Sequence, residues 1–356
     1  MQQVGNPALQ KLHRLEEVVL YCLDMVRPRR VHRLVLVYEL GLPCLYVARE
    51  CGVRRVALGD ALRLARFFLG VVCRLHGLLS PCFFGSWLSC RGRKDTPRNE
   101  MEKPGWILTF SDDFTSGSLD PTKWQTSPWY GSPYLHDWTS GTTPSVYLDP
   151  LGFSFGANTV RLISSDQVVM NQTSPLWKDA ATQQMLPFNI PYRGAWMMWP
   201  NPGSLDQQYG YFEIRCKTPE PPAAYPAFWL YGRYQEPDEI DIFEFNVTGM
   251  PDVFTTTVHW GADKPDHKMK GKSHQVCRPW QLFHIYACEW SPKEIRWYCD
   301  NQLIRVVARE KILSYFTYPL ALIVSTGPDT RPGQHPETGT YPNFFEVDYV
   351  RVYRRP

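Results

Sequence analysis

Three carboxylates fall within the six residues Glu239–Glu244, inside the stretch Pro237–Phe245. They are Glu239, Asp241 and Glu244, and Ile and Phe fill the places between them. Ile and Phe favour β-strands, and alternate side chains of a strand share a face. Glu239 and Asp241 therefore point the same way. Glu244, three residues further on, points the opposite way in a regular strand.

A β-bulge between Asp241 and Glu244 resolves this mismatch. A bulge adds one residue to a strand, so it returns Glu244 to the face of the other two acids. Three carboxylates gathered on one face repel one another, and that cost is usually tolerated for acid–base chemistry. A solvated edge strand with outward-facing acids is the alternative interpretation of the same spacing.

The elements that must position these acids lie after residue 100, where the composition of the chain changes. The first 100 residues hold 16 Lys and Arg against 8 Asp and Glu, a net charge of +8, and the rest carries −5. Six of the ten cysteines precede residue 91, and twelve of the thirteen tryptophans follow residue 100. We predict a basic, Cys- and Arg-rich extension over 1–103, without a functional fold of its own, and one domain over 104–356.

Two interpretations of the extension stay open. In one it is an upstream extension of the reading frame, with Met101 as the true start; in the other it is a degenerate membrane-targeting segment. Residues 34–38 predict a short strand and 61–69 a basic amphipathic helix, but no membrane-spanning helix is expected. The charged residues of Leu12–Asp24 do not fit a signal peptide at Met1. No nucleic-acid-binding motif accompanies the basic charge, so no nucleic-acid partner is expected.

Many short apolar stretches separated by turns follow residue 104, and no helix of useful length is evident. This pattern predicts an all-β sandwich or jelly roll. The predicted strands are 106–110, 146–149, 159–163, 211–217, 226–231, 239–245, 254–260, 283–290, 295–299, 302–307, 320–324 and 345–353. Residues 121–144 and 165–208 are predicted to be long loops, and the aromatic-rich first one is expected to be functional.

Taken in order along 104–356, these residues resemble glycoside hydrolase family 16, the laminarinase, lichenase, agarase and carrageenase family. The resemblance rests on Trp106–Phe114, Tyr209–Arg215, Pro226–Trp229, Glu239–Glu244, Val258–Gly261, Phe283–Trp290 and Val347–Tyr353. It implies a β-jelly-roll sandwich of two stacked antiparallel sheets, with a substrate cleft across the concave face. The acids then flank a scissile glycosidic bond, which argues against the edge-strand interpretation.

The resemblance also implies a role for each acid. Glu239 matches the nucleophile and Glu244 the general acid/base of a retaining, double-displacement mechanism. Asp241, between them, is expected to hydrogen-bond Glu239 and to hold its charge state. The ExDxxE spacing is the bulged form of the family motif, and it argues against a strict lichenase. Catalysis is expected to need no cofactor.

Four further residues are predicted to bind sugar. His259 and Trp229 match cleft-facing positions of the family, and an aromatic side chain offers a sugar ring a rigid apolar surface. Trp138 and Trp196 are predicted to lie near the same cleft.

A structural calcium is a further expectation from the resemblance. Asp348 matches a calcium ligand of many family members, Asp113 lies in a block close to that site, and oxygen ligands suit calcium. The four cysteines after residue 200 have no spacing that demands a disulfide, although Cys288 and Cys299 lie on strands predicted to pair.

These inferences predict an endo-acting retaining β-glycosidase that hydrolyses a polysaccharide, in the first place a β-1,3-glucan of laminarin type. Only nine residues separate Trp229 from Glu239, and this short connection resembles the agar- and carrageenan-type galactan hydrolases, which are the second candidate. A non-catalytic carbohydrate-binding protein is the third, and three mutually repelling acids argue against it. A monomer, extracellular or in the cell envelope, is expected from the substrate.

Overall fold

The computed structural model describes strands within residues 21–56 and then the chain from 90 to 356, apart from 91, 129–133, 136–144, 174–178, 180, 202, 223, 234–237, 246–249, 262–265, 309–314 and 332. Its internal contacts divide it into Met1–Ser89 and Cys90–Pro356. The domain boundary predicted between residues 103 and 104 is not tested further and stays a prediction. No helix in the described residues has the length and apolarity of a membrane span.

The first unit contains an antiparallel four-stranded sheet in the order β1-β2-β3-β4. Its strands are β1 (Tyr21–Arg27), β2 (Arg30–Glu39), β3 (Leu42–Arg49) and β4 (Gly52–Val56). The strand predicted over 34–38 is confirmed as part of β2. The helix predicted over 61–69 lies outside the described residues.

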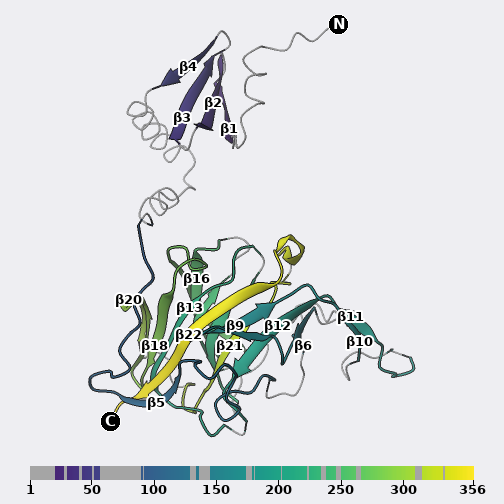
Figure 1. Ribbon diagram of the computed structural model, residues 1–356, viewed down its shortest axis with the longest axis vertical. Helices are drawn as coiled ribbons and strands as arrows, with labels where there is room; N and C mark the ends of the chain where they lie inside the picture. Colours follow the sequence, from purple (N-terminus) through teal and green to yellow (C-terminus); the bar gives the residue numbers. More distant parts are fainter. Residues whose placement is uncertain are drawn as a thin grey trace. The chain divides into compact units, whose positions relative to one another are not determined.

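The second unit is a sandwich of two eight-stranded sheets (Figure 1). The first sheet, in spatial order, is β17 (Lys268–Gln275), β16 (Val253–Trp260), β15 (Glu239–Phe245), β14 (Ala227–Tyr231), β21 (Ala321–Thr326), β12 (Tyr192–Met198), β7 (Val146–Leu148) and β6 (Tyr134–Leu135). The second is β20 (Gln302–Ala308), β19 (Glu294–Cys299), β18 (His284–Trp290), β13 (Gly210–Lys217), β22 (Asn343–Arg354), β9 (Val160–Ser164) and β8 (Phe153–Phe155), with β5 (Ile107–Asp112) paired to β22. Neighbouring strands are antiparallel except β7 and β12.

One hydrophobic core fills the space between the sheets. Ile240 and Phe243 of β15 contribute to it from the first sheet, and Phe212 and Tyr286 contribute from the second. The rings of Phe243 and Tyr286 lie 4.7 Å apart. Side chains that alternate with these point away from the core, so each sheet has an outer face. The predicted all-β jelly-roll sandwich is confirmed, and a hairpin of β10 (Val169–Gln172) and β11 (Phe188–Ile190) is added to it.

Three strands of the first sheet contradict the sequence interpretation. The two-residue β6 lies within the loop predicted over 121–144. The long loop predicted over 165–208 is wrong, because β12 lies well inside the sheet, between β21 and β7. Residues 195–198 of β12 are all buried, so the strand lacks the apolar–polar alternation that identifies a half-buried strand. The edge strand β17 was also not predicted, because it is mostly polar and exposed; lysines are common on edge strands, where they discourage pairing with other chains.

The outer face of the second sheet is covered by residues 90 and 92–106, here called the strap. The strap leads into β5 beside β22 (Figure 1). A disulfide joins Cys90 to Cys277, and the amide of Thr96 donates a hydrogen bond to the carbonyl of Phe283 at 2.8 Å. The sequence did not indicate this disulfide, and Cys288 and Cys299 are free thiols. The strap therefore packs as part of the sandwich.

Candidate active site

The bulge predicted in the acid motif is confirmed. Strand β15 pairs regularly with β16 as far as Asp241 opposite Thr257, and the next pair is Glu244 opposite Thr255. Two residues of β15 therefore face one residue of β16, and both of them, Ile242 and Phe243, are buried in the inter-sheet core. The extra residue restores the alternation, so Glu244 lies on the same outer face as Asp241.

His259 connects the two strands at this point. It is the cross-strand partner of Glu239, and its Nε2 lies 3.2 Å from Oδ2 of Asp241. When Nε2 donates to that carboxylate, Nδ1 accepts a hydrogen bond from Nε2 of His267, 3.0 Å away. Among the described residues, only Glu239, Asp241 and His259 bring three potential metal ligands within 4.8 Å of one another. The carboxyl group of Asp241 interacts with the His259 imidazole and forms a hydrogen bond with Glu239.

The acids lie in an environment that opposes their ionisation. Burial raises the pKa of Glu244 to about 7, and the negative charge of Asp241 adds to the rise. Burial likewise raises the pKa of Glu239 well above its usual value, with Asp241 and Glu244 adding to the effect. Burial lowers the pKa of His259, but the hydrogen bond to Asp241 and its charge outweigh it and raise that pKa overall. A carboxyl group with a near-neutral pKa, such as Glu244, suits proton transfer in both directions.

An aromatic cluster lies beside the acids on the outer face of the first sheet. Trp229 is the cross-strand partner of Asp241, is half-buried, and donates its indole N–H to Oγ of Ser325 at 3.2 Å. Its ring packs edge-on against Trp196 and Tyr231, with centroids 5.3 and 5.7 Å away. The structure thus brings Trp229 and Trp196 together near the acids, while Trp138 lies outside the described residues.

The two tryptophans differ in exposure. Trp196 is only 3% exposed, so it lies beneath other side chains, whereas Trp229 retains accessible surface. The sequence interpretation missed Tyr231, although its place two residues after Trp229 puts it on the same face of β14.

The carboxylates predicted to bind calcium are paired with arginines. Asp348 Oδ2 lies 2.7 Å from Nη1 of Arg215 and 3.3 Å from Nε of Arg98. Asp113 is paired with Nη2 of Arg98 at 3.2 Å and with Nη2 of Arg351 at 3.3 Å. Calcium takes six to eight oxygen ligands, and three guanidinium groups here supply positive charge instead. The side chains present at Asp113 and Asp348 do not fit a calcium ion.

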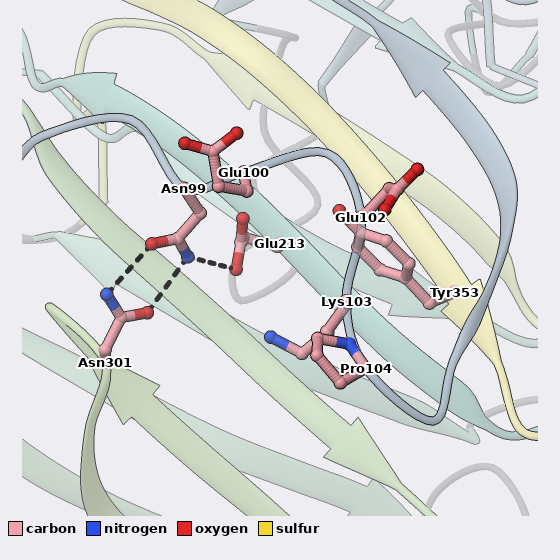
Figure 2. Close-up of a pocket in the computed structure, with 8 residues that line it drawn as sticks. All are labelled: Asn99, Glu100, Glu102, Lys103, Pro104, Glu213, Asn301 and Tyr353. Carbon is pink, nitrogen blue, oxygen red and sulfur yellow. Dashed lines mark hydrogen bonds between the residues drawn. The ribbon is translucent and has the colours of Figure 1, made fainter.

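The strap also contacts Glu213 of β13, beside a shallow cavity (Figure 2). Nδ2 of Asn99 donates to Oε2 of the buried Glu213 at 2.8 Å, and the amides of Asn99 and Asn301 pair reciprocally at 3.0 Å. A shallow cavity of about 210 Å³ is lined there by Asn99, Glu100, Glu102, Lys103, Pro104, Glu213, Asn301 and Tyr353. None of the three catalytic candidates lines it, since they lie on the outer face of the other sheet.

The stretch of the chain that matches a known family contains the acids themselves. The model of glycosyl hydrolases family 16 matches residues 202–341, which include Glu239, Asp241 and Glu244. Over these residues the chain is similar to that family. The expected resemblance is therefore confirmed over the part of the chain that carries the bulged strand.

Single proteins match the chain at low to moderate sequence identity. The chain is 35% identical over 173 residues to a "Beta-glucanase" of Rhodothermus marinus, which covers 43% of this chain and 59% of that protein. It is 25% identical over 274 residues to "Glucan endo-1,3-beta-glucosidase A1" of Niallia circulans, covering 70% of this chain and 38% of that protein. The crystal structure of the laminarinase from Rhodothermus marinus matches with 27% identity and a TM-score of 0.52, over 70% of this chain and 97% of that one. The chain thus spans only part of these curated relatives.

Proposed function

We propose that the second unit is an endo-acting retaining β-glycosidase that hydrolyses a polysaccharide, in the first place a β-1,3-glucan of laminarin type. The observation that carries the proposal is the bulge, which sets Glu244 on the same face of the first sheet as Asp241 and Glu239. The similarity to glucanases and to a laminarinase supports the same class of substrate. No cofactor enters the proposed reaction.

The proposed reaction has two displacements. In the first, Glu244 gives its proton to the glycosidic oxygen while the carboxylate of Glu239 attacks the anomeric carbon, so the leaving chain departs as an alcohol. In the second, Glu244 takes a proton from water, whose oxygen displaces Glu239 from the anomeric carbon. Asp241 hydrogen-bonds Glu239 and shares its proton, which allows Glu239 to ionise beside two other acids. His259 holds Asp241 in place.

The aromatic cluster supplies the proposed binding surface for the sugar chain. Trp229 is adjacent to Asp241 across the strands. A sugar packed against the exposed surface of its ring therefore lies next to the acids. Trp196 and Tyr231 pack against that ring and restrict its rotamers. His259 offers a polar contact on the other side of β15.

A galactan of agar or carrageenan type is the second candidate substrate. The observation that favours it is the short connection between β14 and β15, residues 232–238, which leaves little chain to wall off the site at this end. We propose that the protein acts as a monomer outside the cell or in the cell envelope, where such polysaccharides lie. A disulfide such as Cys90–Cys277 is typical of oxidising compartments.

Release of reducing ends from laminarin, lichenan, agarose and carrageenan tests the proposal. We expect laminarin to be cut to a ladder of oligosaccharides, and proton NMR to show that the first product keeps the β-configuration. Preferential release from agarose or carrageenan would favour the second candidate. Binding of a polysaccharide without release from any of the four would instead identify a carbohydrate-binding protein.

A further inference from the structure

Tyr225, which the sequence interpretation did not single out, contacts the proposed acid/base directly. It precedes β14, and its hydroxyl donates a short hydrogen bond to Oε1 of Glu244. Its backbone is fixed as well, because its amide donates to the carbonyl of Gly327 at 2.8 Å and the neighbouring Ala224 forms a bridge with Pro328. The residues before β14 and after β21 are thus joined at this end of the site.

Arg331 holds the tyrosine ring from the other side. Its guanidinium carbon lies 4.0 Å from the centroid of the Tyr225 ring. Asp329, 1% exposed at its side chain, accepts hydrogen bonds from Nε and Nη2 of Arg331 at 2.8 and 2.7 Å. The guanidinium therefore lies in a fixed plane over the ring, and a chain of contacts runs from Asp329 through Arg331 and Tyr225 to Glu244.

These contacts distinguish the two oxygens of Glu244. Oε1 accepts the phenolic proton, whereas among the described residues no donor reaches Oε2. A carboxylic acid whose Oε1 is already an acceptor carries its own proton on Oε2. The hydroxyl also stabilises the carboxylate form, because a hydrogen bond donated to a charged group favours that group's charged state.

We propose that Tyr225, braced by Arg331 on Asp329, is a positioning residue that confines the catalytic proton of Glu244 to Oε2 and keeps that oxygen turned toward the glycosidic oxygen. The inference rests on the proposed function, since it takes Glu244 as the acid/base. Tyr225 itself exchanges no proton with substrate; it acts through Glu244.

Loss of the hydroxyl changes the balance of charges around Glu244. Without it, burial and the negative charge of Asp241 raise the pKa of Glu244 further, opposed by the positive charges of His259 and Arg331. The titratable and charged groups that surround Glu244 are Glu239 and Asp241 on β15, His259 on β16, Tyr225 before β14 and Arg331 after β21.

The test is Tyr225→Phe in the full chain, assayed on the polysaccharide that the wild type cleaves. We expect kcat to fall about tenfold and the alkaline limb of the kcat/KM profile to move up by about one pH unit. We also expect the burst of dinitrophenol from an activated aryl glycoside of the same sugar to be retained, because that leaving group needs no proton. Arg331→Gln should also lower kcat and move the alkaline limb to higher pH, but by smaller amounts than Tyr225→Phe.

Tyr298→Phe is the matched control. Tyr298 also donates to a glutamate, Oε2 of Glu289 at 3.2 Å, but it does so on the outer face of the second sheet. The Tyr298→Phe variant should keep the wild-type pH profile. An unchanged profile in Tyr225→Phe, or equal losses on the polysaccharide and the aryl glycoside, would overturn the positioning role. A wild type that cleaves no polysaccharide would instead overturn the proposed function, so the two failures are distinct.

Discussion

The indole N–H of Trp297, in the second sheet, donates a hydrogen bond of 2.9 Å to the backbone carbonyl of Asp241, in the first. Both partners are buried, and Asp241 is the last regularly paired residue before the bulge. A bulge interrupts the ladder of backbone hydrogen bonds. The opposite sheet thus supplies a donor at the point where the acid strand leaves its regular pairing.

Trp297→Phe is expected to destabilise the protein and lower its activity together. It leaves a buried carbonyl without a donor, which costs about 1–3 kcal/mol, and it loosens the bulge that aims Glu244. We expect a lower midpoint in urea unfolding and a several-fold lower kcat. Trp290→Phe is the matched control, because Trp290 is equally buried and its indole N–H has no partner among the described residues. If both variants lose kcat equally, the hydrogen bond does not position the acids.

Because the pKa of Glu244 is raised, replacing its carboxyl group should stabilise the protein at high pH. Its folded-state pKa of about 7 lies above the usual 4.5, so the folded state binds the proton more tightly. Ionisation therefore destabilises the fold progressively as the pH rises from about 5 to 8. The free energy of unfolding of Glu244→Gln should be close to that of the wild type at pH 5. At pH 8 it should be higher by about 1–2 kcal/mol, after allowance for solvent screening.

An exposed carboxylate of the strap, Glu102, provides the control for that experiment. Glu102→Gln changes the net charge equally but should give no pH-dependent difference from the wild type. A difference between Glu244→Gln and the wild type that stays constant from pH 5 to pH 8 would show that Glu244 ionises normally in the folded protein.

The bulge could be predicted from the sequence because it follows from parity alone. Glu239, Asp241 and Glu244 cannot share a face of a regular strand, and Ile and Phe around them fix the strand type. The other predicted strands were identified as short apolar stretches separated by turns. Strand β12 could not be predicted in this way, because it is buried on both faces and its sequence carries no period of two.

The partners of the acids could not be predicted, because they depend on pairings between distant residues. Trp297 reaches Asp241 across 56 residues of sequence, and Tyr225 meets Arg331 only because β14 pairs with β21. The calcium prediction depended on two aspartates whose guanidinium partners come from three separate segments. No local pattern relates such residues.

Substitution of the two proposed catalytic glutamates, Glu239 and Glu244, should separate their roles. Glu244→Gln is expected to slow polysaccharide cleavage by about 10²–10⁴-fold and still to release dinitrophenol in a burst from an activated aryl glycoside. Glu239→Gln is expected to lose both reactions, because no covalent intermediate forms. Circular dichroism should show that both variants are folded. Full polysaccharide activity in either purified variant would contradict the assignment.

The arginine-paired aspartates predict a fold whose stability is independent of calcium. Arg98, 39% exposed at its side chain, bridges Asp113 and Asp348 from the strap. Arg98→Gln should therefore lower the melting temperature by about 1–4 °C, and calcium or EDTA should not shift the wild type. Arg296→Gln is the control, because Arg296 is 41% exposed and its salt-bridge partner Glu294 lies on the same strand; this variant should melt like the wild type. A rise in the wild-type melting temperature with calcium would show that an ion displaces the guanidinium groups.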